Sequence, residues 1–348
     1  MNQAPKNPIA NALSAGVAEK DVAEAIRRSG YPLQTVVARQ LRKGFAVQEE
    51  WSYIDRDTQE QRTIDIHAWT PLYKVPNDQE QPGVRPTLNL LIECKQSSLP
   101  YVFFLSHSKP WVPEFPSLAG LAKDEMTVTS GDDPSSWQYH TLQALGLNSH
   151  PFLSTPSYSS TFSKCVRKGA GLDLSGSESY NGLVLPILKS VLHFQHSERP
   201  PTTAVYFDAH IVVGVGVLDA PMIGVTVDDT STTLTLIPWV RVTRHESLEG
   251  PHTSERTKLR AVDIVHKDFL FDYLDQNVMP FAKDFATLAL KHQVVIANCE
   301  AFVPGMGRDS WNDIETRLKP KTLAASLSRA GSVGRNALNQ LRRKKGET

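Results

Sequence analysis

The feature that most constrains this chain is an apolar segment that ends in charge, residues 87–95 (TLNLLIECK). A continuous apolar run of this length predicts a strand buried on both faces. Side chains alternate across a strand, so Glu93 and Lys95, two positions apart, are expected on the same face. A second strand is predicted over 62–69 (RTIDIHAW), where Asp65 stands between two isoleucines. If the two strands pair, these three charged groups converge.

Such a convergence would have a definite chemistry. Two carboxylates can hold Mg²⁺ or Mn²⁺, which prefer hard oxygen ligands and retain some of their waters. The metal lowers the pKa of a bound water and neutralises charge that develops on a phosphate. Lys95 could orient the attacking water or stabilise the transition state. The alternative interpretation is that these charges are simply solvated where a sheet meets a loop, because an ExK triplet alone is a weak motif.

The surrounding pattern alternates helices with strands. Helical spacing and terminating glycines predict helices over 21–30 and 32–45. Further helices are predicted over 181–194, with Pro186 tolerable only near the first turn, and over 268–292, with a kink at Pro280. Segments rich in strand-forming residues predict strands over 46–55, 62–69, 87–95, 100–106, 203–217, 221–227 and 236–244.

Residues 30–69 and 90–104 (the latter LLIECKQSSLPYVFF) together resemble the restriction-endonuclease-like PD-(D/E)xK nuclease superfamily. They are most similar to bacterial proteins in which a Gly-Tyr-Pro-Leu turn and a helix precede an "iDi…ECK" pair of strands. The resemblance covers residues 24–106 well and the later elements loosely. It implies an α/β (α+β) fold with an αβββαβ core, in which a central mixed sheet is flanked by helices.

The resemblance also implies roles for individual residues. Asp65 and Glu93 would be metal ligands, the backbone carbonyl of Cys94 would complete the metal site, and Lys95 would be catalytic. Ile92 and Cys94 would bracket Glu93 as core-facing residues. The implied activity is Mg²⁺- or Mn²⁺-dependent endonuclease or exonuclease cleavage of nucleic acid, with DNA as the expected substrate.

One position departs from the family pattern. Family members often carry a metal-binding glutamate in the first core helix, and the corresponding residue here is Gln34, a poorer ligand. Either a single metal suffices, or Glu49 or Glu50 substitutes; these two alternate in direction, so only one can point inward. His67 shares the face of Asp65 as a proton shuttle, a metal ligand or a hydrogen-bonding neighbour. Gln96 is a further auxiliary candidate, for contact with phosphate or water.

Composition suggests four regions along the chain. Residues 1–19 are expected to be a flexible lead-in, and 20–300 a nuclease-like domain with a loop-rich insertion at about 107–180. Residues 301–348 are expected to be a basic tail, because the segment from Thr316 onward contains nine basic residues and only one acidic residue. Such a tail would bind nucleic acid through its charge, or else serve as a disordered solubilising segment.

Bulk properties exclude several classes of protein. Thirty-seven basic residues balance 37 acidic ones, so any nucleic-acid surface must arise from local segregation of charge. The three cysteines are widely spaced, which argues against a disulfide framework or a zinc site. Neither a signal peptide nor a membrane-spanning segment is expected, and the predicted location is the cytoplasm.

The sequence therefore predicts a nuclease that serves anti-phage defence or DNA processing, with DNA as partner and no membrane association. A homodimer or a partner protein of a defence system would be compatible with this role. One alternative is a catalytically inactive nuclease-fold protein that binds nucleic acid or scaffolds a complex. Another is a metal-dependent hydrolase of a small phosphate ester. The sequence leaves open DNA against RNA, strandedness, and endonuclease against exonuclease activity.

Overall fold

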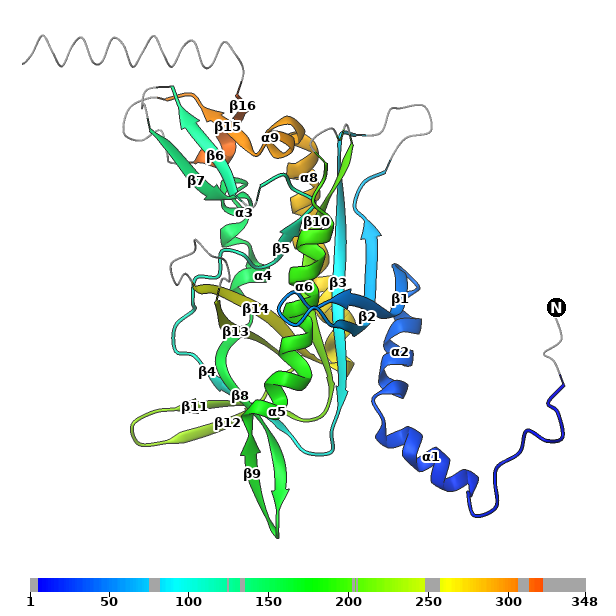
Figure 1. Ribbon diagram of the computed structural model, residues 1–348. Helices are drawn as coiled ribbons and strands as arrows, with labels where there is room; N and C mark the ends of the chain where they lie inside the picture. Colours follow the sequence, from blue (N-terminus) through cyan, green and yellow to red (C-terminus); the bar gives the residue numbers. More distant parts are fainter. Residues whose placement is uncertain are drawn as a thin grey trace, which may run out of the picture.

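The computed structural model describes residues 6–74, 82–123, 125–131, 135–201, 204, 206–247, 257–305 and 313–321. Its N-terminal third follows the predicted order of two helices and three strands (Figure 1). The elements are α1 (Glu19–Arg28), α2 (Tyr31–Leu41), β1 (Ala46–Ile54), β2 (Gln61–Pro71) and β3 (Val84–Gln96). The three strands form an antiparallel meander. Helix α2 begins at Tyr31, after Gly30 as N-cap, with Pro32 in its first turn, where a missing N–H costs no helical hydrogen bond.

The strand next to β3 in the sheet, on the side away from β2, comes from much later in the chain. Helix α6 (Leu185–Ser197) leads into β10 (Phe207–Asp219), which runs parallel to β3 over its whole length. The register pairs Glu93 with Gly216 and Lys95 with Leu218. The element order helix, three antiparallel strands, helix, parallel strand is therefore present as α2-β1-β2-β3-α6-β10, with residues 97–184 between β3 and α6.

Eight other strands extend this sheet to twelve, in the order β1-β2-β3-β10-β14-β13-β8-β4-β11-β12, with β5 beside β10 and β9 beside β8. They are β4 (Tyr101–Leu105), β5 (Ser117–Ala119), β8 (Ser157–Lys168), β9 (Gly171–Ser175), β11 (Met222–Val227), β12 (Thr232–Leu236), β13 (Trp239–Ser247) and β14 (Thr257–His266). Parallel and antiparallel pairs alternate irregularly, which confirms the predicted mixed sheet.

A second, four-stranded sheet has the order β16-β15-β6-β7. Its strands are β6 (Glu125–Ser130), β7 (Ser136–His140), β15 (Glu300–Val303) and β16 (Lys319–Pro320). The remaining helices are α3 (Thr141–Ala144), α4 (Pro151–Ser154), α5 (Gly176–Ser179), α7 (Leu270–Tyr273), α8 (Met279–Lys291), α9 (Gln293–Asn298) and α10 (Ile314–Arg317), with short 3₁₀ turns at Leu147–Ser149 and Lys267–Phe269.

Two regions differ from what the sequence predicts. The segment 107–180, predicted to be loop-rich, contains five strands (β5 to β9) and three short helices. The basic tail does not begin at 301, because β15 pairs with β6 and Leu318 is buried in the main core. Both differences have the same cause. Most of these strands are short or polar on one face, and β5, β6, β8 and β15 each have a partner that is distant in sequence, so local periodicity does not reveal them. The predicted tail from residue 322 onward lies outside the described residues.

The two long helices each contain a wider turn just before a proline. Tyr180–Val184 forms a π-helical turn ahead of Pro186 in the first turn of α6, and Leu274–Val278 does the same ahead of Pro280 in α8. Proline lacks the N–H that would bond the preceding turn, and a π-turn accommodates that break. The predicted helix over 268–292 is therefore interrupted near Pro280, as its sequence suggests.

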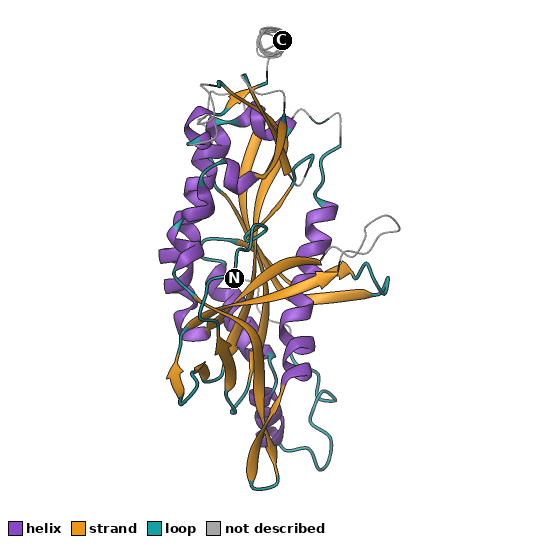
Figure 2. Cartoon of the chain, turned by 90° about the vertical axis from the view of Figure 1, so that its left-hand side faces the viewer, coloured by secondary structure: helices purple, strands orange, loops and turns teal. Residues whose placement is uncertain are grey.

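Helices cover both faces of the central strands (Figure 2). On one face, α2 and α8 contribute Leu33 and Phe281 to a large apolar core with Ile92 of β3. On the other face, α6 contributes Ile187 to a second core with Leu91. Neighbouring residues of β3 thus serve opposite cores, and the strand is buried on both faces as its sequence predicts. In the described part of the chain, no helix is long and apolar enough to cross a membrane.

Candidate active site

Strands β2 and β3 separate at the position where the predicted site lies. Their main-chain pairing runs from Pro71 with Thr87 to Ile66 with Ile92 and goes no further. At the next position, the carboxylate of Asp65 accepts a hydrogen bond from the backbone N–H of Cys94, with an N···O distance of 2.7 Å. A side chain thus takes the place of a backbone partner, which fixes Asp65 against the end of β3.

An irregularity in β1 lies opposite Asp65. Glu49 pairs with Ile66 and Trp51 with Ile64, but Glu50 between them has φ of 50°, a left-handed conformation that is unfavourable for a glutamate. The side chains of β2 change from one face of the sheet to the other at this point. Ile66 packs in the core on the α2 side, whereas Ile64 packs in the core on the α6 side. Strained residues of this kind are concentrated at functional sites.

Glu93 and Lys95 lie side by side at the end of β3, as their spacing predicts. Nζ of Lys95 is hydrogen-bonded to Oε1 of Glu93. The carboxylate of Glu93 is 7% exposed and the Lys95 side chain 35% exposed. Ile92 and Cys94, on either side of Glu93, are buried in the core on the α2 face. We refer to Asp65, Glu93 and Lys95 as the carboxylate site.

The carboxylate site combines buried negative charge with one cation. Burial, followed by the negative charge of Asp65, raises the pKa of Glu93 to about 7. Burial also raises the pKa of Asp65, against the opposing effects of the Cys94 N–H and of Lys95. Burial alone would lower the pKa of Lys95, but the neighbouring carboxylates outweigh it and the pKa is raised. The site thus holds two acids that repel each other and a lysine that stays charged.

The donor atoms at the site suit a hard divalent cation. Asp65 and Glu93 supply carboxylate oxygens, and the Cys94 carbonyl points to the same edge of β3 as its N–H, towards Asp65. A Cβ atom added to Gly30 would lie 3.7 Å from this carbonyl oxygen, which places the start of α2 beside it. Among the described residues, no group of three or more His, Cys, Asp and Glu side chains could hold a metal ion. The remaining ligands would be water, as Mg²⁺ commonly retains.

Gln34 lies at the carboxylate site and links its parts. Its side chain is buried, and Nε2 donates to Oε1 of Glu50 at 2.8 Å and to the backbone carbonyl of Asp65 at 3.1 Å. Glu49 is instead paired with Arg42, at 2.5 Å. Of the two acids proposed as substitutes, Glu50 therefore lies on the Gln34 side and Glu49 does not.

The other two auxiliary candidates lie apart from the carboxylates. His67 is buried among aromatic rings, and its Nε2 is 3.0 Å from Oδ1 of Asn89. Nδ2 of Asn89 in turn donates to Nδ1 of His210, at 2.9 Å. Burial lowers the pKa of His67. His67 thus belongs to a buried polar chain with Asn89 and His210, and Gln96 is exposed where β3 ends.

The same edge of the sheet contains residues that the sequence did not predict to be part of a site. Asp219 ends β10 and is paired with Lys267, at 3.1 Å. An open depression of about 530 Å³ lies beyond Ser97 and is lined by Asp219, Met222 and His266 among others. The carboxyl ends of β3, β10 and β14 meet here, which sequence spacing alone could not reveal.

Comparison with protein-family models, with curated proteins and with solved structures found no match to this chain.

Proposed function

We propose that this chain is a metal-dependent phosphodiesterase that cleaves nucleic acid at the carboxylate site. The observation that carries the proposal is the position of Asp65, Glu93 and Lys95 where two antiparallel strands separate. A buried pair of carboxylates beside a charged lysine is costly for folding alone, which favours a functional reason for the arrangement.

The element order supports the same proposal. Helix α2, the meander β1-β2-β3, the crossover helix α6 and the parallel strand β10 follow the αβββαβ order of restriction-endonuclease-like nucleases. The residues that would act lie on β2 and β3, the last two strands of this meander. Within this proposal the other strands of the large sheet are additions to that core.

In the proposed mechanism, Asp65, Glu93 and the Cys94 carbonyl would hold Mg²⁺ or Mn²⁺. The bound cation would supply Lewis-acid chemistry and a water of lowered pKa. The Cys94 N–H and the Gln34 amide fix the orientation of Asp65 from two sides. Lys95 keeps its proton and presents a cation to a phosphate oxygen or to the attacking water. Its charge is screened only in part from solvent, so an anionic substrate can reach it.

A plasmid-nicking assay with Mg²⁺, Mn²⁺ and EDTA tests the proposal. The wild-type chain is expected to nick DNA with either metal and not with EDTA. Lys95→Met removes the cation but keeps the length of the side chain, and should lower the rate by about 100-fold. Lys168→Met is the matched control, because Lys168 forms an exposed ion pair with Asp173 on the β8–β9 hairpin. Equal loss in both variants, or wild-type cleavage in Lys95→Met, would contradict the assignment.

A second candidate function is nucleic-acid binding without cleavage. It is favoured by Gln34, which supplies an amide where the resembled nucleases often have a metal-binding acid, and by the pairing of Lys95 with Glu93. Gln34→Glu distinguishes the two. If the wild-type chain binds DNA without cutting it and Gln34→Glu gains metal-dependent cleavage, the presence of glutamine in place of an acid at position 34 accounts for the missing activity. A role in anti-phage defence or DNA processing stays a prediction under either function.

A further inference from the structure

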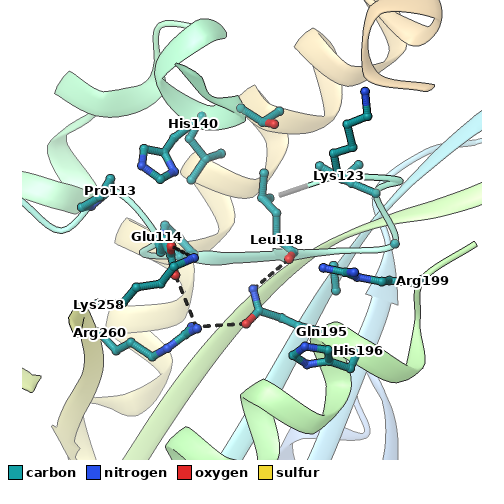
Figure 3. A pocket seen from close by; sticks show the side chains of 16 residues that line it. Pro113, Glu114, Leu118, Lys123, His140, Gln195, His196, Arg199, Lys258 and Arg260 are labelled. Carbon is teal, nitrogen blue, oxygen red and sulfur yellow. Dashed lines mark hydrogen bonds and ion pairs between the residues drawn. The ribbon is translucent and has the colours of Figure 1, made fainter. Parts of the chain in front are cut away.

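A second site lies at the opposite end of β10, in the pocket of Figure 3. Ala119 of β5, in the pocket wall, pairs with His210, whereas Glu93 pairs with Gly216. At about 3.3 Å per residue of strand, roughly 20 Å separate the two sites. The pocket has a volume of about 60 Å³ and is enclosed by β5, the end of α6, the start of β14, and the segments around Glu114 and Thr141.

The wall of this pocket is predominantly positive. The described residues that line it include four cations and one carboxylate, that of Glu114. Glu114 pairs with Lys258 at 2.5 Å and lies 3.5 Å from Arg260. The other two cations are Lys123 and Arg199. We call this site the basic pocket, because its described lining carries more cations than carboxylates, a pattern that favours anions.

Arg260 is held in a fixed orientation. Its side chain is 9% exposed, and Nη1 donates to Oε1 of Gln195, at 3.3 Å. Nε2 of Gln195 donates to the backbone carbonyl of Leu118, at 3.0 Å (Figure 3). A guanidinium fixed in this way loses little conformational entropy when it binds a planar or tetrahedral oxyanion.

A buried hydroxyl in the wall has no partner. Thr141 is 2% exposed, and among the described residues Oγ1 makes no hydrogen bond. A buried polar group without a partner destabilises a protein. The oxygen atom is itself covered, so this hydroxyl lies behind the surface of the pocket and is not a contact for a ligand.

The shape of the pocket depends on a close backbone approach. Gly120, at the end of β5, has φ of +78°, and a Cβ there would lie 1.8 Å from the carbonyl oxygen of Asp208. Only glycine fits this position, which brings β5 against β10. His196 is less suited to bind an anion, because Nδ1 bonds the Leu192 carbonyl and Nε2 lies 2.6 Å from Arg56 Nη1.

We propose that the basic pocket binds the phosphate group of a phosphomonoester. A volume of about 60 Å³ accommodates a few water-sized groups, at about 10–15 Å³ each, which suits one phosphate and leaves the rest of the ligand outside. Phosphate oxygens would accept hydrogen bonds from Arg260 and Lys258, in addition to the contacts that these two cations make with Glu114. Its source is a small nucleotide or the 5′ end of a nucleic-acid strand. This binding is independent of cleavage at the carboxylate site.

Calorimetric titration of the full chain in EDTA tests the proposal, because EDTA removes any metal-dependent contribution. The ligands are inorganic phosphate, AMP, adenosine, and one oligonucleotide with either a 5′-phosphate or a 5′-hydroxyl. Phosphate and AMP are expected to bind and adenosine is not. Tighter binding of the 5′-phosphorylated oligonucleotide than of its 5′-hydroxyl form identifies a strand end as the source, and equal binding of the two forms identifies a small nucleotide. Absence of binding by both phosphate and AMP overturns the proposal.

Three variants locate the binding. Arg260→Gln and Lys258→Gln should each weaken AMP binding by about tenfold or more, whereas Lys168→Gln on the exposed hairpin should not. Thr141→Val keeps the shape but removes the unpartnered hydroxyl. It should raise the melting temperature of the free protein and leave the affinity for AMP unchanged, because the hydroxyl is covered. An unchanged AMP affinity in Lys258→Gln would overturn the assignment even if Arg260→Gln fails to fold.

Discussion

The carboxylate site and the basic pocket lie at opposite ends of β10 and are built in different ways. The carboxylate site takes its charged groups from two consecutive strands, so Asp65, Glu93 and Lys95 fall within 31 positions of sequence. The basic pocket draws its wall from segments between Pro113 and Arg260. The first site is acidic and the second basic. The difference shows that the residues of a site can be predicted from sequence when consecutive strands supply them.

The largest expected effect is a loss of cleavage at the carboxylate site with no change in ligand binding at the basic pocket. Asp65→Asn and Glu93→Gln should lower metal-dependent cleavage by at least about 100-fold, because each removes a charged oxygen donor. AMP binding at the basic pocket should be unchanged. Glu49→Gln is the matched control, since Glu49 pairs with Arg42 away from the site. Cleavage rates and calorimetry on the same preparations check this, and a parallel loss of AMP binding would show that the two sites are not separate.

The next effect concerns the stability of the fold near the basic pocket, where a buried ion pair lies. Arg241 is fully buried, is paired with Asp263 at 2.7 Å, and stacks on Phe115 beside the pocket. Asp263→Asn should destabilise the fold by about 3 kcal/mol, because it leaves a buried guanidinium without its counter-charge. Urea unfolding measures the change. Asp173→Asn, in an exposed ion pair, should leave the midpoint unaltered, and an equal midpoint for wild type and Asp263→Asn would contradict the buried-pair argument.

A smaller effect depends on pH and involves His210, which pairs with Ala119 at the basic pocket. Burial is the main cause that lowers the pKa of His210 from 6.5 to about 4, and Nδ1 accepts a hydrogen bond from Asn89. The folded state therefore favours the neutral ring. Its contribution is fully present above pH 6.5 and is lost as pH falls towards 4, by about 3 kcal/mol.

Unfolding free energies measured between pH 4 and 7 check this expectation. His210→Gln keeps a hydrogen-bonding side chain but cannot titrate, so its stability should vary less with pH in this interval. His107, which is exposed, provides the control as His107→Gln. An unchanged pH dependence in His210→Gln would assign the loss of stability to other groups, such as His67.

The smallest effect concerns the basic C-terminal segment. Residues 322–348 contain six basic residues and one acid, and this composition predicts that they bind nucleic acid through charge. Truncation after Lys321 spares β16 and the buried Leu318. It should reduce the slope of log K against log salt by about 0.9 for each phosphate that the segment neutralises in the full chain. DNA binding measured over a salt series tests this, and an identical slope for both chains would exclude the segment from the binding surface.

Several features of this protein were determined by sequence alone. The apolar run over 87–95 specified a strand buried on both faces, and its alternation placed Glu93 beside Lys95. The order of α2, β1, β2 and β3 was also predictable, because helical spacing, alternation and turn residues act over a few neighbours. These features are local, and the physical interactions that fix them are local too.

Other features were decided only by the tertiary structure. Glu49 and Glu50 are adjacent and chemically alike, and the left-handed backbone at Glu50 determined which of them meets Gln34. His67 was expected near Asp65 but lies in an aromatic cluster, because the hairpin changes face between Ile64 and Ile66. Twist and bulges of this kind arise from packing between strands, which no local pattern encodes.

The strands of 107–180 and the basic pocket show the same limit at longer range. β6 pairs with β15 and β8 with β13, across more than 80 positions of sequence in each case. Lys258 and Arg260 are two positions apart on β14 and share a face, which the sequence could have indicated, but the segments that face them are α6 and β5. Long-range pairing is selected by the free energy of burying the whole core, so it is a property of the assembled fold and not of any one segment.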